Sequence, residues 1–195
     1  MTPRKIRNRA IYIVVTCTGT RIARAIRVVT RMPYCHASVS ADENLSALYS
    51  FSRSFSSMPL PATFNLEYVG KGLLGKYSYI PCEIYAVPVT EEQYAHFLAI
   101  LGHFTAFRKR YSYSLIGLLR VKMQIEKNLR HKFVCSQFVA YVLHECGITL
   151  QKKPCLYSPD DLRFLPQARL VYRGELNSYY RDANPEDAVL MPSAV

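Results

Sequence analysis

The sequence predicts a single domain of the α+β class, and three observations support this. Residues 11–16 are β-branched and almost continuously apolar, which is typical of a strand buried on both faces. Segment 35–40 alternates strictly between apolar and polar residues, and segment 47–52 follows it as a second strand. Segments 90–101 and 135–146 instead repeat their apolar residues at the spacing of one helix face. The 195 residues suffice for one sizeable core and are too few for two comfortable ones.

We therefore expect one domain over residues 1–195, in which a small antiparallel sheet packs against the helix that begins at Cys135. Residues 183–195 show no periodicity and are expected to form a flexible tail.

The chain is basic, with 25 Lys and Arg against 14 Asp and Glu and a formal net charge of +11. Such an excess favours an anionic partner, namely lipid, nucleic acid or an acidic polymer. The basic residues are scattered without a long Lys/Arg block, so a solvated surface explains most of them, and nucleic acid is disfavoured. Residues 21–31 differ, because their pattern predicts a basic amphipathic helix. Such a helix either packs on the neighbouring sheet or lies on an anionic membrane surface.

The cysteines predict neither a metal site nor a disulfide framework. No two of them form a Cys-x-x-Cys pair, and their wide spacing does not resemble a zinc cluster. The sequence also lacks a Gly-rich phosphate loop, so we expect no metal and no cofactor. The basic start of the chain leads into a short apolar run at 10–17 and then Thr18-Gly19-Thr20, not a small-residue cleavage site. With no apolar run of membrane-spanning length, we expect a cytoplasmic protein with reduced thiols.

A hairpin is predicted after the basic segment. The strands at 35–40 and 47–52 flank a turn at 42–44, which brings His36 on the first strand near Ser50 or Ser52 on the second.

Two loops surround the short strand expected at 64–69. Residues 53–60 are Ser-rich, and residues 70–76 carry spaced glycines. A long loop inside a compact domain often covers a substrate, so this region is a candidate lid.

The second half begins with a strand at 83–89, followed by Thr90-Glu91-Glu92-Gln93, which predicts a capping box at the start of a helix. Residues 111–119 are predicted to be helical. Residues 157–162 predict a short helix with Pro at its first position, and residues 170–176 predict the last strand.

Cys135 opens the most regular helical pattern of the chain, which ends where Gly147 tolerates a left-handed backbone. The thiol therefore lies in the first turn, where the partial positive charge of the helix stabilises a thiolate. That is how many nucleophilic cysteines are built. The alternative is that Cys135 is a small buried hydrophobe, as most free cysteines are.

A nucleophilic cysteine needs a base, and His36 is the best placed of the five histidines. It stands on the polar face of a predicted strand, where a rigid element holds an imidazole against a helix N-terminus. The others fit surface or structural positions on helices or in the basic connector: His96, His103, His131 and His144.

The order of these motifs resembles a known family. A strand histidine followed much later by Phe-x-Cys-Ser-x-Phe-Val at a helix start is similar to the circularly permuted NlpC-type branch of the papain-like cysteine hydrolases. YiiX/YebB-like proteins and the lecithin retinol acyltransferase group belong to that branch. The resemblance rests on Tyr34-Cys35-His36-Ala37-Ser38, Leu48-Tyr49-Ser50-Phe51, Tyr111-Ser112-Tyr113 with Gly117, Phe133-Val134-Cys135-Ser136-Gln137-Phe138-Val139, and Ser158-Pro159-Asp160-Asp161-Leu162.

The resemblance implies a permuted papain-like fold, with Cys135 as nucleophile and His36 as general base and acid. It also implies an acyl-thioenzyme and a backbone oxyanion site at the helix start. The family's third residue, which orients the histidine, should come from the strand after His36. This chain offers Ser50 there, where relatives often carry Glu or His, and Glu67 is the acidic alternative if the chain folds back.

We expect a cysteine hydrolase, a peptidase or amidase by type, that cleaves an amide or ester bond in a peptide or lipid-like acyl substrate. Two other functions remain open. The thioester could be captured by an alcohol or amine, which would make the chain an acyltransferase. Alternatively, the chain is a non-catalytic basic module that binds anionic lipid or nucleic acid, with binding that depends steeply on salt.

Overall fold

A six-stranded antiparallel sheet forms the centre of the molecule, in the order β4-β3-β2-β1-β5-β8. The structure, a computed structural model, describes residues 9–18, 32–53, 62–113, 121, 123–126 and 132–186. The strands are β1 (Arg9–Thr16), β2 (His36–Ser40), β3 (Leu48–Arg53), β4 (Ala62–Glu67), β5 (Pro81–Val89) and β8 (Arg169–Glu175), and a separate parallel pair is formed by β6 (Ser112–Tyr113) and β7 (Lys132–Phe133).

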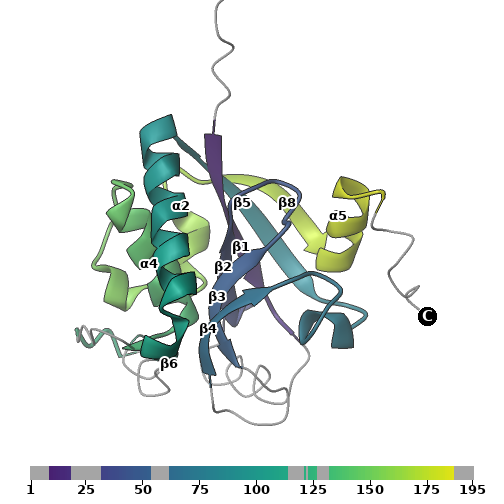
Figure 1. Ribbon diagram of the computed structural model, residues 1–195, viewed down its shortest axis with the longest axis horizontal. Coiled ribbons are helices and arrows are strands. Elements are labelled where there is room, and N and C mark those ends of the chain that lie inside the picture. The colour runs from purple at the N-terminus through teal and green to yellow at the C-terminus, as the bar shows by residue number, and fades with distance from the viewer. Residues whose placement is uncertain are drawn as a thin grey trace, which may run out of the picture.

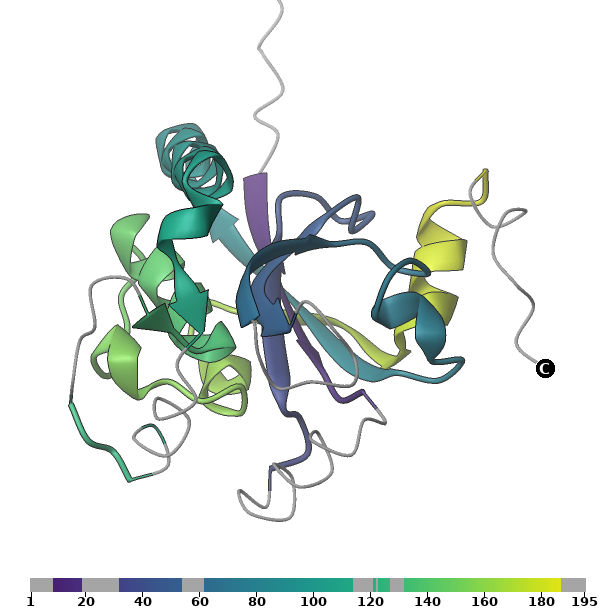
Figure 2. The same ribbon diagram turned by 60° about the horizontal axis from the view of Figure 1, so that its bottom comes forward.

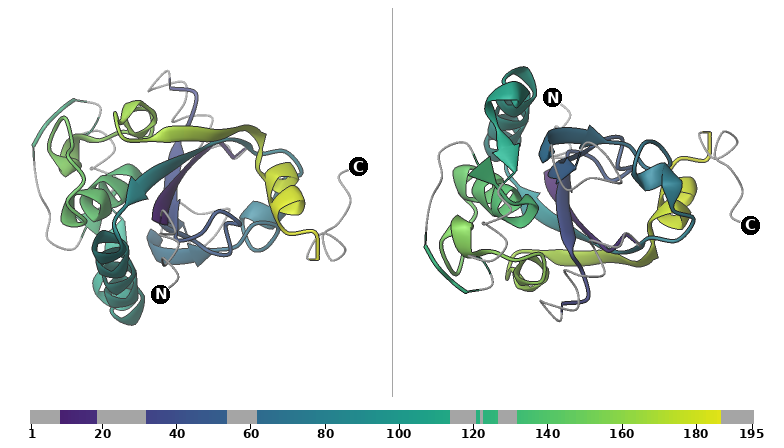
Figure 3. Two further views of the ribbon diagram at one scale, coloured as in Figure 1. Left: turned by 90° about the horizontal axis from the view of Figure 1, so that it is seen from above. Right: turned by 90° about the horizontal axis from the view of Figure 1, so that it is seen from below.

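Three helices flank this sheet in the described part of the chain: α2 (Glu91–Ala106), α4 (Cys135–Glu145) and α5 (Leu176–Ala183). The short 3-10 turns are η1 (Leu74–Lys76), η2 (Arg108–Arg110), η3 (Pro154–Leu156) and η4 (Asp161–Phe164). Helices α2 and α4 cover one face of the sheet, and α5 lies on the opposite side (Figure 1). The sheet is strongly curved, with its edges bending toward α5 (Figure 3). The α+β class expected from the sequence is confirmed.

Each face of the sheet has its own hydrophobic core. Alternate residues of β1 divide between the two, so that Ile13 packs toward α2 and α4 while Val14 packs toward α5. On the α5 side, η1 and α5 lie next to each other (Figure 2), and buried Leu74 and Leu176 belong to the same cluster. Both faces being covered explains why β1 is almost continuously apolar.

An aromatic cluster fixes α4 against the sheet. The ring of Phe51 lies 5.4 Å from that of Phe138, 5.8 Å from that of Phe64 and 6.1 Å from that of Phe104, measured between centroids. Edge and tilted contacts of this kind each add about 0.5–1.5 kcal/mol beyond the burial of area. The start of α4 is therefore held on a rigid part of the molecule.

The predicted start of α2 and the predicted end of α4 are confirmed. At the start of α2, the Gln93 N–H donates to the Thr90 hydroxyl (3.1 Å) and the Thr90 N–H donates to the Gln93 side chain (3.0 Å), which completes the capping box. At the end of α4, Gly147 has a φ of 77°, and the N–H groups of Gly147 and Ile148 bond the carbonyls of His144 and Leu143. That pair of bonds is a Schellman motif, which needs the left-handed residue.

Two expectations for the second half were wrong. Residues 111–119 do not begin as a helix, because Ser112–Tyr113 pair with β7 while residues 114–120 lie outside the described part. Segment 157–162 is not a capped helix. The Asp161 carboxylate accepts the N–H and hydroxyl of Ser158, which closes a turn, and the 3-10 turn η4 starts only at Asp161.

The glycine-spaced segment 70–76 is a folded turn, with internal backbone bonds from Lys71 to Tyr68 (3.1 Å) and from Gly75 to Lys71 (3.0 Å). The predicted basic helix at 21–31, most of the Ser-rich loop at 53–60 and the last nine residues of the expected tail lie outside the described residues. Among the described helices, none has the length and apolar character needed to cross a membrane.

Candidate active site

Cys135 is the first residue of α4, and its environment is set by the way this helix begins. Val134 is the N-cap, with an extended backbone and no capping side chain of its own. The first bond of the helix runs from the Phe138 N–H to the Val134 carbonyl (3.0 Å). The N–H groups of Cys135 and Ser136 therefore have no acceptor within the helix and point out of its start. They are the donors that an oxyanion next to the thiol would meet.

Two buried polar side chains anchor the start of α4 to the segment around η3. Ser136 donates its hydroxyl hydrogen to the Tyr157 carbonyl (2.6 Å), and Gln137 donates from Nε2 to the Cys155 carbonyl (2.6 Å). Gln137 also accepts the Val134 N–H at 3.2 Å. Gln137 thus supports the helix start, as expected of a first-turn residue.

His36 lies at the start of β2, which runs beside β1, and α4 packs on this strand. Its Nε2 atom is 3.3 Å from Oε2 of Glu67, and Cys135 is close enough to raise the pKa of the same ring. The imidazole therefore contacts a carboxylate and lies near the thiol, with 20% of its side chain exposed.

The neighbours of His36 favour its charged form. Burial by itself lowers the pKa of His36, but the hydrogen bonds and charges of Cys135 and Glu67 outweigh it and raise the pKa from 6.5 to about 10. An imidazolium is thus expected at neutral pH, with the Glu67 carboxylate 3.3 Å from its Nε2 atom.

Glu67, at the end of β4, is the group that orients the histidine ring. Burial acts to raise the pKa of Glu67, but hydrogen bonds from His36, Ser50 and Ser52 and the imidazolium charge lower it below its usual range. Ser50 donates its hydroxyl to Oε2 of Glu67 at 2.6 Å, the same oxygen that faces His36. The carboxylate is therefore charged and held in place.

Of the two candidates for the third position, Ser50 and Glu67, it is Glu67 whose side chain contacts His36. Among the hydrogen bonds of the described residues, Ser50 reaches the ring only through the carboxylate. The pairing of β3 with β4 explains this, because Ser50 lies opposite Asn65, two residues from Glu67 on the same face. Since the carboxylate is longer than the serine side chain, it extends across to the imidazole. The sequence feature that pointed to this contact was Glu67 itself, an acidic residue on the strand predicted after that of Ser50.

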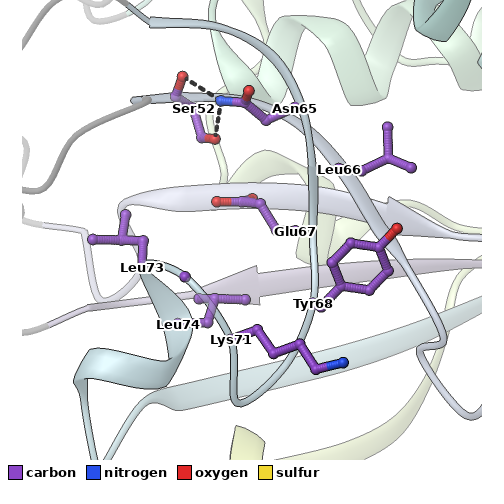
Figure 4. A pocket seen from close by; sticks show the side chains of 9 residues that line it. Ser52, Asn65, Leu66, Glu67, Tyr68, Lys71, Leu73 and Leu74 are labelled. Atoms are coloured by element: carbon purple, nitrogen blue, oxygen red, sulfur yellow. Dashed lines mark hydrogen bonds between the residues drawn. The ribbon is translucent and has the colours of Figure 1, made fainter.

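A cavity of about 250 Å³ lies behind Glu67, whose carboxylate points into it (Figure 4). Its walls come from β3, β4 and the turn before η1: Ser52, Asn65, Leu66, Glu67, Tyr68, Lys71, Gly72, Leu73 and Leu74. The turn requires glycine, since Gly70 and Gly72 have φ angles of 75° and 56°. A Cβ atom on Gly75 would collide with the Gly70 carbonyl. The cavity therefore has a rigid wall of backbone on one side and the orienting carboxylate on the other.

Sequence reasoning missed a buried carboxylate on β5. Glu83 is 2% exposed and binds Arg163 (2.6 Å) and Arg173 (2.7 Å), and it accepts the hydroxyl of Tyr85. The Arg163 guanidinium also covers the ring of Tyr34, two residues before His36, at 5.2 Å. This cluster therefore fixes Tyr34, and with it the residues that lead into β2. Its members lie far apart in the sequence, so no local pattern marks them.

The remaining described histidines lie away from this site. His103 pairs with the Tyr111 hydroxyl (3.1 Å), His144 lies beside Glu145 (3.7 Å) and His96 is exposed. His131 falls outside the described residues. Within the part of the chain that the structure describes, no three His, Cys, Asp or Glu side chains are arranged to hold a metal ion.

Comparisons with known proteins give no relative. The chain matches no family model, no curated protein and no solved structure.

Proposed function

We propose that the chain is a cysteine hydrolase of the permuted papain-like type, a peptidase or amidase, that cleaves an amide or ester bond through Cys135, His36 and Glu67. The single observation that carries this proposal is that His36 contacts the Glu67 carboxylate at 3.3 Å and lies close enough to Cys135 for its pKa to be raised by it. A thiol, an imidazole and a carboxylate in that order are the parts that thiol-dependent acyl transfer requires.

Each group has a role that its position supports. The Cys135 thiolate attacks the carbonyl carbon of the substrate, and the N–H groups at the start of α4 stabilise the resulting oxyanion. The His36 imidazolium gives its proton to the leaving amine or alcohol, which leaves an acyl-thioester on Cys135. His36 then takes a proton from water as the water attacks the thioester, and the acid product departs. Glu67 holds the ring and stabilises its charged form throughout.

The substrate class follows from the bond that is attacked. We propose a peptide, isopeptide or lipid-like acyl substrate in the cytoplasm, where the widely spaced cysteines would remain thiols. The same thioester would serve an acyltransferase if an alcohol or amine replaced water. Analysis of the products with and without such an acceptor separates hydrolysis from transfer.

The first test is the rate at which iodoacetamide labels Cys135 between pH 5 and 9, in the wild type and in His36→Ala. We expect labelling of the wild type to stay fast well below pH 8.5, where an ordinary thiol is protonated, and to slow at least about tenfold in the variant. Mass spectrometry of the Cys135 peptide gives the rate, and the half-buried Cys155 serves as the comparison thiol in the same digest.

Slow labelling of Cys135 in both proteins would contradict the proposal. The basic non-catalytic module would then be the better explanation, and it predicts salt-dependent binding to anionic vesicles that Cys135→Ala leaves unchanged.

A further inference from the structure

Two thiols, Cys17 and Cys35, lie against each other directly before His36. Cys17 follows β1, Cys35 directly precedes His36 and Cys135 begins α4. The sulfur atoms of Cys35 and Cys17 are 3.6 Å apart, and the Cys35 thiol also approaches the Thr16 carbonyl at 3.8 Å. The mechanism above uses only Cys135, so the other two thiols have no assigned role.

The pair is close enough to Cys135 to be influenced by it. Burial, then the neighbouring Cys17 thiol, then the charge on Cys135 raise the pKa of Cys35. Cys35 is half-buried and Cys17 is buried. Because no three metal-ligating side chains converge in the described part of the chain, the chemistry open to this pair is that of a dithiol.

We propose that Cys17 and Cys35 form a reversible redox pair that switches the candidate active site off when the two are joined in a disulfide. The proposal rests on the proposed function, since it assigns a regulation to the same site. The pair lies where β1 and β2 run side by side, with Thr16 opposite His36. A bond between the two sulfurs therefore links the strand ends immediately before the catalytic histidine.

The disulfide would displace His36. A disulfide bond is about 2.0 Å long, so sulfur atoms 3.6 Å apart must approach each other by roughly 1.6 Å. Cys35 shares a peptide bond with His36, and the ring of His36 contacts Glu67 at 3.3 Å and interacts electrostatically with Cys135. A displacement of about 1 Å in a catalytic group can reduce a rate by roughly 100-fold.

The oxidant is a small disulfide such as oxidised glutathione. A thiolate of the pair attacks one sulfur of glutathione disulfide, which forms a mixed disulfide and releases one glutathione. The second thiol of the pair then displaces the other glutathione, and its proton leaves with it. Two protein thiols and one glutathione disulfide thus become one protein disulfide and two glutathione molecules.

The experiment equilibrates the full chain in a series of reduced and oxidised glutathione mixtures. After free thiols are blocked, the digest is mapped by mass spectrometry without reduction, and the labelling rate of Cys135 is measured in parallel. We expect a peptide pair linked through Cys17 and Cys35, a fall in Cys135 labelling of at least about tenfold as the linkage accumulates, and full recovery with dithiothreitol.

Two variants separate this switch from general oxidation. In Cys17→Ser, the Cys135 that the map shows to be free of glutathione should label in oxidising mixtures at the rate of the reduced protein. In Cys155→Ser, that same fraction of Cys135 should label slowly, as in the wild type. Binding of one phenylarsine oxide per wild-type chain, lost in Cys17→Ser and in Cys35→Ser, gives a second measure of the dithiol.

The results that would overturn the proposal are specific. They are a missing Cys17–Cys35 linkage, a linkage that leaves Cys135 labelling unchanged, or inactivation of Cys17→Ser like the wild type. If the reduced wild type does not label rapidly at Cys135, the proposed hydrolase fails instead, while the linkage map still decides whether the redox pair exists.

Discussion

Glu67, which the sequence offered only as the alternative to Ser50, contacts both His36 and Ser50 in the structure. Its carboxylate is 12% exposed, and it holds the ring of His36 on one side and the hydroxyl of Ser50 on the other. A carboxylate at this position stabilises an imidazolium, whereas a serine would only orient the ring. The site therefore has a charge that the expected Ser50 would not have supplied.

This assignment predicts a graded loss of reactivity. Glu67→Gln keeps the size of the side chain but removes its charge, so labelling of Cys135 near pH 6.5 should fall about 100-fold. Ser50→Ala removes only the bond that holds the carboxylate, and about a tenfold fall is expected. Ser46→Ala, an exposed serine bonded to Asp42, is the matched control and should behave as the wild type. Equal rates in Glu67→Gln and the wild type would remove Glu67 from the mechanism.

The raised pKa of His36 also predicts a pH dependence of stability. The folded protein retains a proton on His36 up to a pKa of about 10, whereas the unfolded chain releases it near 6.5. This contribution is fully present below pH 6.5 and is lost as the pH rises through 10. Urea unfolding should therefore show that the wild type loses more stability between pH 7 and 10 than His36→Gln does. His103→Gln is the control and should follow the wild type; a parallel loss in all three proteins would contradict the shift.

The candidate nucleophile and base are marked by local patterns in the sequence, whereas the residue that contacts the histidine ring is not. Cys135 and His36 sit at element starts that local patterns mark. Which residue reaches His36 depends instead on how β4 returns beside β3, and no local pattern specifies that register.

At the scale of elements, α4 is held at its start by side chains rather than by a capping residue. The Val134 side chain cannot cap the helix. Instead, the side-chain oxygen of Gln137 accepts the Val134 N–H, and its Nε2 donates to the Cys155 carbonyl. The thiol is thus positioned by a buried polar anchor two residues away.

Removal of that anchor should destabilise the fold and disturb the thiol together. Gln137→Ala leaves the Val134 N–H and the Cys155 carbonyl without partners, and we expect a loss of about 1–3 kcal/mol in urea unfolding, with slower Cys135 labelling. Gln93→Ala breaks the capping box of α2, far from the thiol, and should cost about 1 kcal/mol without any change in labelling. A Gln137→Ala protein that labels normally would show that the anchor is only structural.

The ends of helices could be predicted from the sequence where a capping residue or a glycine specifies them, as at Thr90 and Gly147. The prediction was wrong where contacts with other residues determine the local structure. Ser112–Tyr113 pair with a strand twenty residues away, and a local bond between Ser158 and Asp161 replaces the expected helix start.

At the scale of the molecule, one aromatic residue links the sheet to both helices above it. Phe51 is fully buried and contacts rings from β4, α2, α4 and β7. Phe51 thus holds segments that are far apart in the sequence, including the start of α4 with Cys135, against the sheet.

Phe51→Ala should therefore reduce the free energy of unfolding by about 3–5 kcal/mol, since it leaves a cavity that rigid neighbours cannot fill. Phe51→Leu should cost clearly less. Phe164→Ala, at a ring that is 64% exposed, should change stability by no more than about 0.5 kcal/mol. A cost below about 1 kcal/mol for Phe51→Ala would mean that the rings are not a shared core.

The cavity behind Glu67 has a consequence for inhibitor discovery. Glu67 both lines the cavity and contacts the imidazole of His36, whereas Cys135 is not among the lining residues. A compound that fills the cavity would perturb the charge that holds His36 without occupying the space next to the thiol. Such a compound and a thiol-directed warhead would bind the same molecule at the same time.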